Sequence, residues 1–329
     1  MLNDPDNPLH ISRETLQAVA MPHWLIKAAV QRGISWLPNP QKWNELFQEH
    51  VTKSVYLTGE EFERRMGFCR LHLEHFTQFR RPETGFTVLE LGTGWQPIVP
   101  LGLYLCGAAE IWTYDIGGFL NTERLQRLLG MFADAARRGD LAKWLPDLLP
   151  ERLDRMLSIA GRAAAEAPAD FLQRLNIHVR VQDAQQTGLA AGSVDFLFST
   201  GVLEYIPRPI LANILAEFKR VAKPGAITSH YINLRDVYSY FDSSLTPFNN
   251  LKFSERSWKY LNSPLTWQNR LRISDYRELF RNAGFEIVKE TNTNGAEQDL
   301  DRVSLAPQFR NYSRADLLVL LSWIAARAG

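Results

Sequence analysis

The sequence of 329 residues has little cysteine and no surplus of charge of either sign. Its two cysteines, Cys69 and Cys106, are too few for a disulfide framework and favour a reducing compartment. The 37 basic and 36 acidic residues leave a net charge of +1, which predicts no global attraction to nucleic acid or to an anionic membrane. We therefore expect a cytoplasmic protein that binds neither nucleic acid nor membrane.

Long hydrophobic runs are also missing. The longest apolar stretches fall far short of the roughly 20 residues that a membrane-spanning helix needs. Residues 1–6 lack the basic-then-apolar order of a secretory signal. The composition, 45% hydrophobic and 22% charged, is typical of a globular protein with one large domain and appendages, or with two domains.

The order of apolar and polar segments predicts two parts. Residues 1–83 are expected to form a helical N-terminal cap, and residues 84–329 a larger domain. From residue 86 strands alternate with helices, which predicts a Rossmann-like α/β fold: a seven-stranded, mostly parallel sheet with helices on both faces. Helices are expected at 98–106, 209–222 and 274–283. The strands are expected at 86–91, 111–114, 177–181, 194–199, 226–232 and 285–289, with 316–326 as either the seventh strand or a helix.

Two insertions interrupt the alternation. Residues 119–176 look helical throughout, and residues 236–272 are rich in aromatic side chains. Such aromatics either pack in a core or form the wall of a binding pocket. We expect both insertions to lie as a cap over the ligand-binding edge of the sheet.

A buried strand that ends in two closely spaced glycines is the most informative motif. Residues 86–95 read Phe-Thr-Val-Leu-Glu-Leu-Gly-Thr-Gly-Trp, an apolar run followed by Gly92 and Gly94. The glycines let a ligand lie against the main chain, and the turn can lead into a helix N-terminus. Glu90 lies inside the strand end. Its carboxylate is a poor neighbour for phosphate and a good one for a cation.

Acidic residues also follow the next two strands. Because ligands bind beyond the carboxyl ends of parallel strands, Asp115 and Asp183 should lie in the same crevice as the glycine turn. Asp115 is 21 residues beyond Gly94, the distance at which an acid commonly holds the two hydroxyls of a ribose. Asp183 could accept a hydrogen bond from the amine of adenine. The ligand implied is an adenosine that carries a cationic group near Glu90.

A nicotinamide dinucleotide fits these residues less well. Its fingerprint needs a third glycine at position 97, where this chain has Pro97. A pyrophosphate would also meet the carboxylate of Glu90 without a basic residue in the loop to offset it.

The order of these elements resembles the class I S-adenosylmethionine-dependent methyltransferases over about residues 86–290. The resemblance implies S-adenosyl-L-methionine as cofactor and S-adenosyl-L-homocysteine as product. It places Gly92 and Gly94 along the methionine portion, Asp115 at the ribose and Asp183 at the adenine. The motifs that carry it are 88–95, 114–115, 182–184, 193–206, 218–225 and 281–288. The cofactor-binding residues it implies are Glu90, Gly92, Thr93, Gly94, Asp115, Ile116, Asp183, Ala184, Ser199 and Thr200.

The acceptor side of the site is less defined. His230 is the first candidate for a general base, because its ordinary pKa near 6.5 suits proton transfer at neutral pH. A satisfied core histidine is the alternative. Asp236 and Tyr231 follow as catalytic candidates. Many family members have histidine where this chain has Tyr205, which removes any role that depends on that histidine. The residues expected to line the substrate pocket are Tyr205, Trp258, Trp267 and Arg270, unless they only pack or pair with nearby acids.

The predicted function is methyl transfer to a small-molecule acceptor by in-line displacement, with oxygen as the first choice of methylated atom and nitrogen as the second. No metal site is predicted, because the chain has no compact cluster of His, Asp and Glu with ligand spacing. Two alternatives remain open. The chain could be a catalytically silent methyltransferase-like binding or scaffold protein, or a nicotinamide-dependent oxidoreductase. The acceptor, the pathway and the oligomeric state are not predicted.

Overall fold

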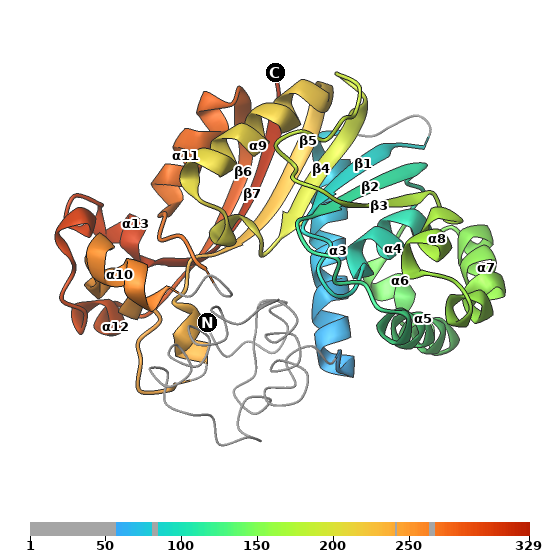
Figure 1. Ribbon diagram of the computed structural model, residues 1–329, viewed down its shortest axis with the longest axis horizontal. Helices are drawn as coiled ribbons and strands as arrows, with labels where there is room; N and C mark the ends of the chain where they lie inside the picture. The colour runs from blue at the N-terminus through green and yellow to red at the C-terminus, as the bar shows by residue number, and fades with distance from the viewer. Residues whose placement is uncertain (1–56, 81–84, 241, 263–266) are drawn as a thin grey trace.

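A seven-stranded sheet forms the centre of the chain (Figure 1). The computed structural model describes residues 57–80, 85–240, 242–262 and 267–329. Within them the strand order is β3-β2-β1-β4-β5-β7-β6, and β7 alone runs antiparallel to its neighbours. This confirms the predicted α/β fold. The strands are β1 (Thr87–Leu91), β2 (Glu110–Asp115), β3 (Ile177–Val181), β4 (Val194–Thr200), β5 (Ala222–Asn233), β6 (Phe285–Asn294) and β7 (Val319–Ala328).

Several strand boundaries differ from the prediction, including the end of β6, which lies at Asn294 and not at residue 289. β5 begins at Ala222, so Pro224 lies inside the strand, where the pairing of β4 with β5 is irregular between Val194 and Phe196. Proline is tolerated at such an irregularity because its missing N–H removes no regular ladder bond. Near the C-terminus, residues 314–318 form a short helix and β7 follows directly. The segment 316–326 therefore contains both of the structures that its sequence left open.

Helices cover both faces of the sheet (Figure 1). The helices are α3 (Gly59–Phe79), α4 (Ile98–Leu105), α5 (Thr122–Arg137), α6 (Leu141–Trp144), α7 (Pro150–Ile159), α8 (Pro168–Gln173), α9 (Arg208–Val221), α10 (Glu255–Leu261), α11 (Ile273–Asn282), α12 (Glu297–Asp301) and α13 (Arg314–Leu318). α9 and α11 share a hydrophobic cluster with Leu89 and Leu197 on one face. α3, α4 and α5 share another with Val88 and Phe196 on the opposite face. Alternate residues of each strand thus enter different cores, as a sheet buried on both faces requires.

Helix α3 precedes the sheet in the sequence and packs against one of its faces. The hydroxyl of Thr58 caps its N-terminus by accepting from the backbone N–H of Glu61 at 3.1 Å. Beyond its C-terminus, Arg80 donates to the Asp195 carboxylate at 2.8 Å. Of the predicted N-terminal cap, 1–56 and 81–83 lie outside the described residues. The boundary between the two predicted domains stays a prediction.

The first insertion is helical, as expected, and extends the layer that α3 and α4 form. Phe132 of α5 meets Phe62 of α3 edge to face, with ring centroids 5.2 Å apart. Arg152 of α7 donates to the carbonyl of Tyr104 in α4 at 2.8 Å. These contacts dock the insertion on the side of the sheet. Its role as an acceptor-site cap stays a prediction.

The second insertion folds against the segment before β7. It contains η4 (Val237–Tyr240), η5 (Asn249–Lys252) and α10. Phe248 and Leu251 share a hydrophobic cluster with Phe309. Phe248 of the aromatic-rich insertion is therefore used to build this small second core, and Tyr238 and Trp258 of the same insertion form a separate hydrophobic cluster.

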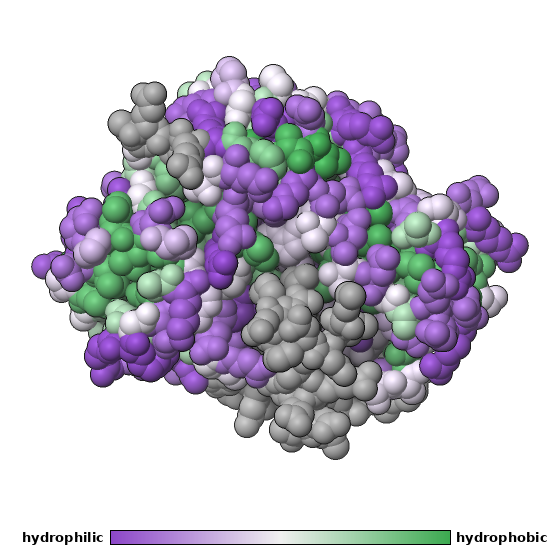
Figure 2. Space-filling model, turned by 180° about the vertical axis from the view of Figure 1, so that it is seen from behind, coloured by the Kyte–Doolittle hydropathy of each residue, from purple (hydrophilic) through white to green (hydrophobic). Residues whose placement is uncertain are grey.

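Hydrophobic side chains reach the surface in separate patches between hydrophilic areas on the face shown in Figure 2. Among the helices of the described residues, none is both long enough and apolar enough to span a membrane.

Candidate active site

The glycine turn after β1 lies directly beside the end of β2. Gly92 has φ of 84° and Gly94 φ of 61°, a region that side chains other than glycine rarely adopt. The backbone N–H of Gly92 donates to the Tyr114 carbonyl at 2.7 Å. The Asp115 carboxylate accepts from the backbone N–H groups of Gly94 at 2.9 Å and Gly117 at 3.1 Å. The sheet therefore brings the first two predicted elements of the cofactor site into direct contact.

Two polar side chains at this turn are buried and have an oxygen with no hydrogen-bond partner among the described residues. Glu90 is 5% exposed, and its Oε2 makes no hydrogen bond to the described residues. Burial, and next the charge of Asp115, raise the pKa of the Glu90 carboxyl well above its ordinary value. The hydroxyl of Thr93 is also buried and unpartnered. Such orphaned groups are uncommon in proteins. Together with the open space around the Gly94 α-carbon, they fit a site that a polar, cationic ligand completes.

The end of β3 supplies a more open part of the same edge. Asp115 pairs in register with Val181, and Asp183 follows two residues later. Asp183 is exposed and accepts from the backbone N–H of Gln185 at 2.9 Å. Ala184 is buried. Ile116 and Val181 are 78% and 61% exposed, so an apolar surface lies beside the two acids, where a flat ring could stack.

A model of the methyltransferase domain family matches residues 151–229, which include β3, β4, all of α9 and the first part of β5. These residues are thus similar to a methyltransferase domain. The match and the strand order described above support the predicted class I S-adenosylmethionine-dependent family, and with it the predicted enzyme class and cofactor. No match is found among curated proteins.

Three solved structures of methyltransferases resemble this chain in fold. One is geranyl diphosphate methyltransferase in complex with GPP and sinefungin: 12% identity, 81% of this chain and 77% of that one, TM-score 0.44. A putative sarcosine dimethylglycine methyltransferase from Galdieria sulphuraria has 13% identity, covering 81% and 86%, with a TM-score of 0.43. Geranyl diphosphate C-methyltransferase from Streptomyces coelicolor A3(2) has 10% identity, covering 82% and 84%, with a TM-score of 0.45.

His230 of the methyltransferase domain lies inside the protein, away from the α3 side of the sheet edge. It is fully buried and packs against Phe218 of α9 and Phe280 of α11. Its Nδ1 is 2.7 Å from the Ser199 hydroxyl, and its Nε2 contacts the hydroxyl of Thr228. Burial lowers the His230 pKa to about 3. His230 is therefore a buried core histidine with both ring nitrogens in polar contacts, and this corrects the prediction that it is a general base. The Ser199 side chain points into the same interior.

Asp236 also has a structural role. It is fully buried, and its carboxylate accepts from the backbone N–H of Tyr238 and from the side chain of Asn249, both at 2.8 Å. It therefore fixes η4 and η5 against each other, which corrects its placement among the catalytic candidates.

Thr200 and Tyr231 lie opposite each other at the ends of β4 and β5, on the α3 side. Tyr231 is 6% exposed and stacks on Phe68 of α3 with centroids 4.7 Å apart. Burial raises the pKa of its phenol, which favours a hydrogen-bond donor over a base. Thr200 is half-buried, and its hydroxyl is 3.0 Å from Nε2 of His72.

This contact belongs to a chain of polar groups that the sequence reasoning missed. Nδ1 of His72 and Nδ1 of His75 each lie 2.9 Å from the hydroxyl of Ser229. The hydroxyl has one hydrogen, so it donates to one imidazole and accepts from the other. Burial lowers the pKa of His72 well below its ordinary value and that of His75 to about 4. The available signal was the spacing of two histidines one helical turn apart on the apolar face of α3.

The predicted pocket residues of the second insertion are not one group. Trp258 is 5% exposed, and its ring nitrogen donates to the Gln268 carbonyl at 3.2 Å. Arg270 lies against the rings of Trp258 and Phe309, each 5.0 Å away, and forms an ion pair with Glu255. Trp258 thus packs in a cluster with Tyr238, and Arg270 lies between Trp258 and Phe309 of the second core, which corrects their placement in a substrate pocket. Trp267 is half-buried, and Tyr205 is 42% exposed beside the end of β4.

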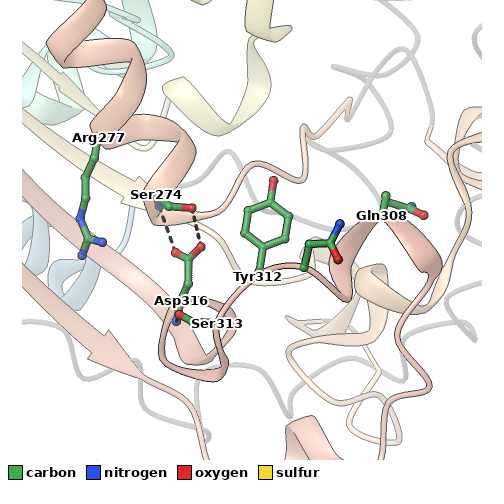
Figure 3. A pocket seen from close by; sticks show the side chains of 7 residues that line it. Ser274, Arg277, Gln308, Tyr312, Ser313 and Asp316 are labelled. Atoms are coloured by element: carbon green, nitrogen blue, oxygen red, sulfur yellow. Dashed lines mark hydrogen bonds between the residues drawn. The ribbon is translucent and has the colours of Figure 1, made fainter.

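A groove of about 550 Å³ lies elsewhere, between the start of α11 and α13 (Figure 3). Asp316 accepts there from the backbone and hydroxyl of Ser274, and the Tyr312 hydroxyl donates to Asp275 at 2.8 Å. Its polar side chains are thus used to join α11 to α13. It contains none of the predicted site residues.

Proposed function

We propose that this methyltransferase acts on a small-molecule acceptor, with oxygen as the methylated atom and nitrogen as the second choice. The observation that carries the cofactor half of the proposal is the Asp115 carboxylate bound to the Gly94 N–H, above the buried and unpartnered Glu90. The net charge of +1 supports a metabolite in preference to nucleic acid.

The described residues would hold S-adenosylmethionine by its three parts. Glu90 and Thr93 would face the methionine portion through the glycine turn, Asp115 the ribose, and Asp183 with Ile116 the adenine. When bound, this cofactor supplies a methyl group on a positively charged sulfur. The protein then has to align the acceptor atom with that methyl group and exclude water. Positioning of this kind can account for roughly 7–11 kcal/mol of a barrier.

An acceptor oxygen or nitrogen that enters protonated must also lose a proton. His230 lies under α9 and α11 with both ring nitrogens engaged, so it does not support this step. The Thr200 hydroxyl and the Tyr231 phenol are placed better, because both lie on the α3 side at the strand ends. We propose that they orient the acceptor group by hydrogen bonds.

Calorimetry with S-adenosylmethionine and S-adenosylhomocysteine tests the cofactor site. We expect wild type to bind both, and Asp115→Ala to bind both at least tenfold more weakly, because each lost charge-assisted hydrogen bond costs about 1.5–3 kcal/mol. Asp154→Ala, on the exposed surface of α7, is the matched control and should bind as wild type does. Wild type that binds neither compound would overturn the proposal.

A further inference from the structure

We propose that the acceptor carries an anionic oxygen group, a carboxylate or a phosphate, and that Arg235 with Tyr240 binds it just beyond the end of β5. This inference rests on the proposed function, because it names the class of molecule that enters the acceptor side of that site.

Arg235 is held rigidly in place. Its backbone N–H donates to Asn233 Oδ1 at 3.1 Å, and its carbonyl accepts from the Gln268 side chain at 2.7 Å. Its Nε donates to the Ser239 hydroxyl at 2.9 Å. The guanidinium carbon lies 4.6 Å from the centre of the Tyr240 ring. A guanidinium ordered in this way loses little entropy when it binds a ligand.

Among the described residues, the outer end of this arginine has no anion to pair with. No carboxylate of the described residues lies within ion-pair distance of Arg235, and its two terminal nitrogens make no hydrogen bond there. Two other partly exposed arginines do have carboxylate partners. Arg277 pairs with Glu290 at 2.6 Å, and Arg80 pairs with Asp195 at 2.8 Å. A paired, fork-shaped donor set is well suited to carboxylate or phosphate oxygens.

Polar contacts connect this arginine to the end of β5. The side chain of Asn233, the last residue of β5, donates to the Tyr240 hydroxyl at 3.0 Å. Two residues earlier, Tyr231 lies beside the turn after β4: its Cδ1 is 4.0 Å from the position of a Cβ on Gly201. The charges of Arg64 and Glu204 act on the pKa of both phenols, and Tyr240 also raises the pKa of Tyr231. The two phenols therefore lie near each other, between the turn after β4 and Arg235.

The acidic groups near this surface would not repel an anion strongly. The Glu204 carboxyl is 2% exposed, and burial raises its pKa to about 8, so it is mostly neutral at pH 7. The Asp236 carboxylate is next to Arg235 in sequence, but it accepts from Tyr238 and Asn249. Arg64 adds positive charge, although Glu61 pairs with it. Phenol hydroxyls and a guanidinium are all donors, which favours an anionic acceptor over an ammonium one.

Calorimetry on the full chain saturated with S-adenosylhomocysteine tests the inference. The probes are benzoate for a carboxylate and inorganic diphosphate for a phosphate, with tetramethylammonium as the cationic comparison. We expect one of the two anions to bind and the cation not to. Arg235→Gln should weaken anion binding at least tenfold and leave S-adenosylhomocysteine binding unchanged. Arg256→Gln, exposed on α10, is the matched control and should behave as wild type does.

Two further variants keep the test decisive if Arg235→Gln is poorly folded. Arg235→Lys keeps the charge without the fork and should retain weakened anion binding. Tyr240→Phe keeps the ring and should weaken it about threefold. Binding of S-adenosylhomocysteine without binding of either anion, or anion binding that Arg235→Gln leaves unchanged, would overturn the inference while leaving the proposed function intact. Failure of S-adenosylhomocysteine to bind at all would instead overturn the proposed function.

Discussion

At the scale of single residues, the buried acid under the glycine turn distinguishes this site from an ordinary nucleotide loop. Glu90 lies away from water with an unpartnered oxygen, and burial raises its pKa. An ionised carboxylate there is costly unless a cation lies near it. The residue therefore favours a positively charged ligand over a neutral one of the same shape.

The residue-scale prediction concerns the preference of Glu90 for a positively charged ligand. Glu90→Gln should lower the affinity for S-adenosylmethionine, whose sulfur is positively charged, by more than it lowers the affinity for neutral S-adenosylhomocysteine. We expect the ratio of the two dissociation constants to change at least fivefold, measured by calorimetry at pH 7.5. Asp154→Ala again serves as control. Equal losses for both compounds would show that Glu90 acts through the shape of the loop and not through its charge.

At the scale of elements, the site depends on how closely α3 and α4 approach each other. Gly102 of α4 lies against Cys69 of α3, and a Cβ on Gly102 would be 2.5 Å from the Cys69 sulfur. Both residues are fully buried, and α3 brings His72 to Thr200 one turn further along. A change in this helix contact should therefore shift His72 relative to Thr200 at the end of β4.

The element-scale prediction is that Gly102→Ala destabilises the protein by about 1–3 kcal/mol, because a well-packed core has no room for the added methyl group. Cys69→Ala removes the clashing sulfur. The double variant should therefore lose less stability than the sum of the two single changes, by about 1 kcal/mol or more in urea unfolding. Gly130→Ala in α5, with no atom within 4 Å of its Cβ position, is the control and should not destabilise. Additive losses would contradict the predicted contact.

At the scale of the whole molecule, buried ionisable groups of both kinds determine how stability varies with pH. Burial lowers the pKa of His230 to about 3 and of His75 to about 4, below the ordinary 6.5. Below pH 6.5 the unfolded chain therefore takes up protons that the folded chain does not, and stability falls. Burial raises the pKa of Glu204 to about 8 and of Asp236 to about 6. Above their unfolded values, near 4.5 and 3.8, these acids ionise first in the unfolded chain, so stability falls as pH rises toward 8.

The molecule-scale prediction is a broad maximum of stability near pH 6, with a loss of about 1 kcal/mol toward pH 8 and of about 0.5 kcal/mol toward pH 4.5, because the histidines and the carboxyl groups partly offset each other. Urea unfolding followed by circular dichroism at half-unit pH steps would measure it. Glu204→Gln should flatten the alkaline side, because it removes one carboxyl that ionises only in the unfolded chain. A stability that rises steadily from pH 4.5 to pH 8 would contradict the assignment of these groups as buried and neutral.

The sequence predicted the cofactor half of the candidate site better than the acceptor half. The residues around the glycine turn could be placed from the sequence, because parallel strands bring their carboxyl ends to one edge wherever they occur. Asp115 next to Gly94 is the result. The acceptor half depends on which face of β5 a residue enters and on which helix covers it. His230 and Tyr231 are neighbours in sequence, yet α9 and α11 cover the first and α3 contacts the second. The alternation of a strand places the two side chains on opposite faces, but the sequence near β5 does not specify which helices cover each face.

The sequence by itself determined the α/β fold and the resemblance to the methyltransferase family, and it predicted the edge of the sheet at which we propose that the cofactor binds, because these follow from local patterns of apolar runs, glycines and acids repeated in a fixed order. Only the tertiary structure decided the environment of each polar side chain. It buried His230, tied Asp236 and Arg270 into structural contacts, and brought His72 to Thr200 across 128 positions of sequence. It also left Arg235 ordered, with no acidic partner among the residues that the structure describes. Those outcomes depend on packing between segments distant in the chain, and that packing determines which ionisable groups remain free to meet a ligand.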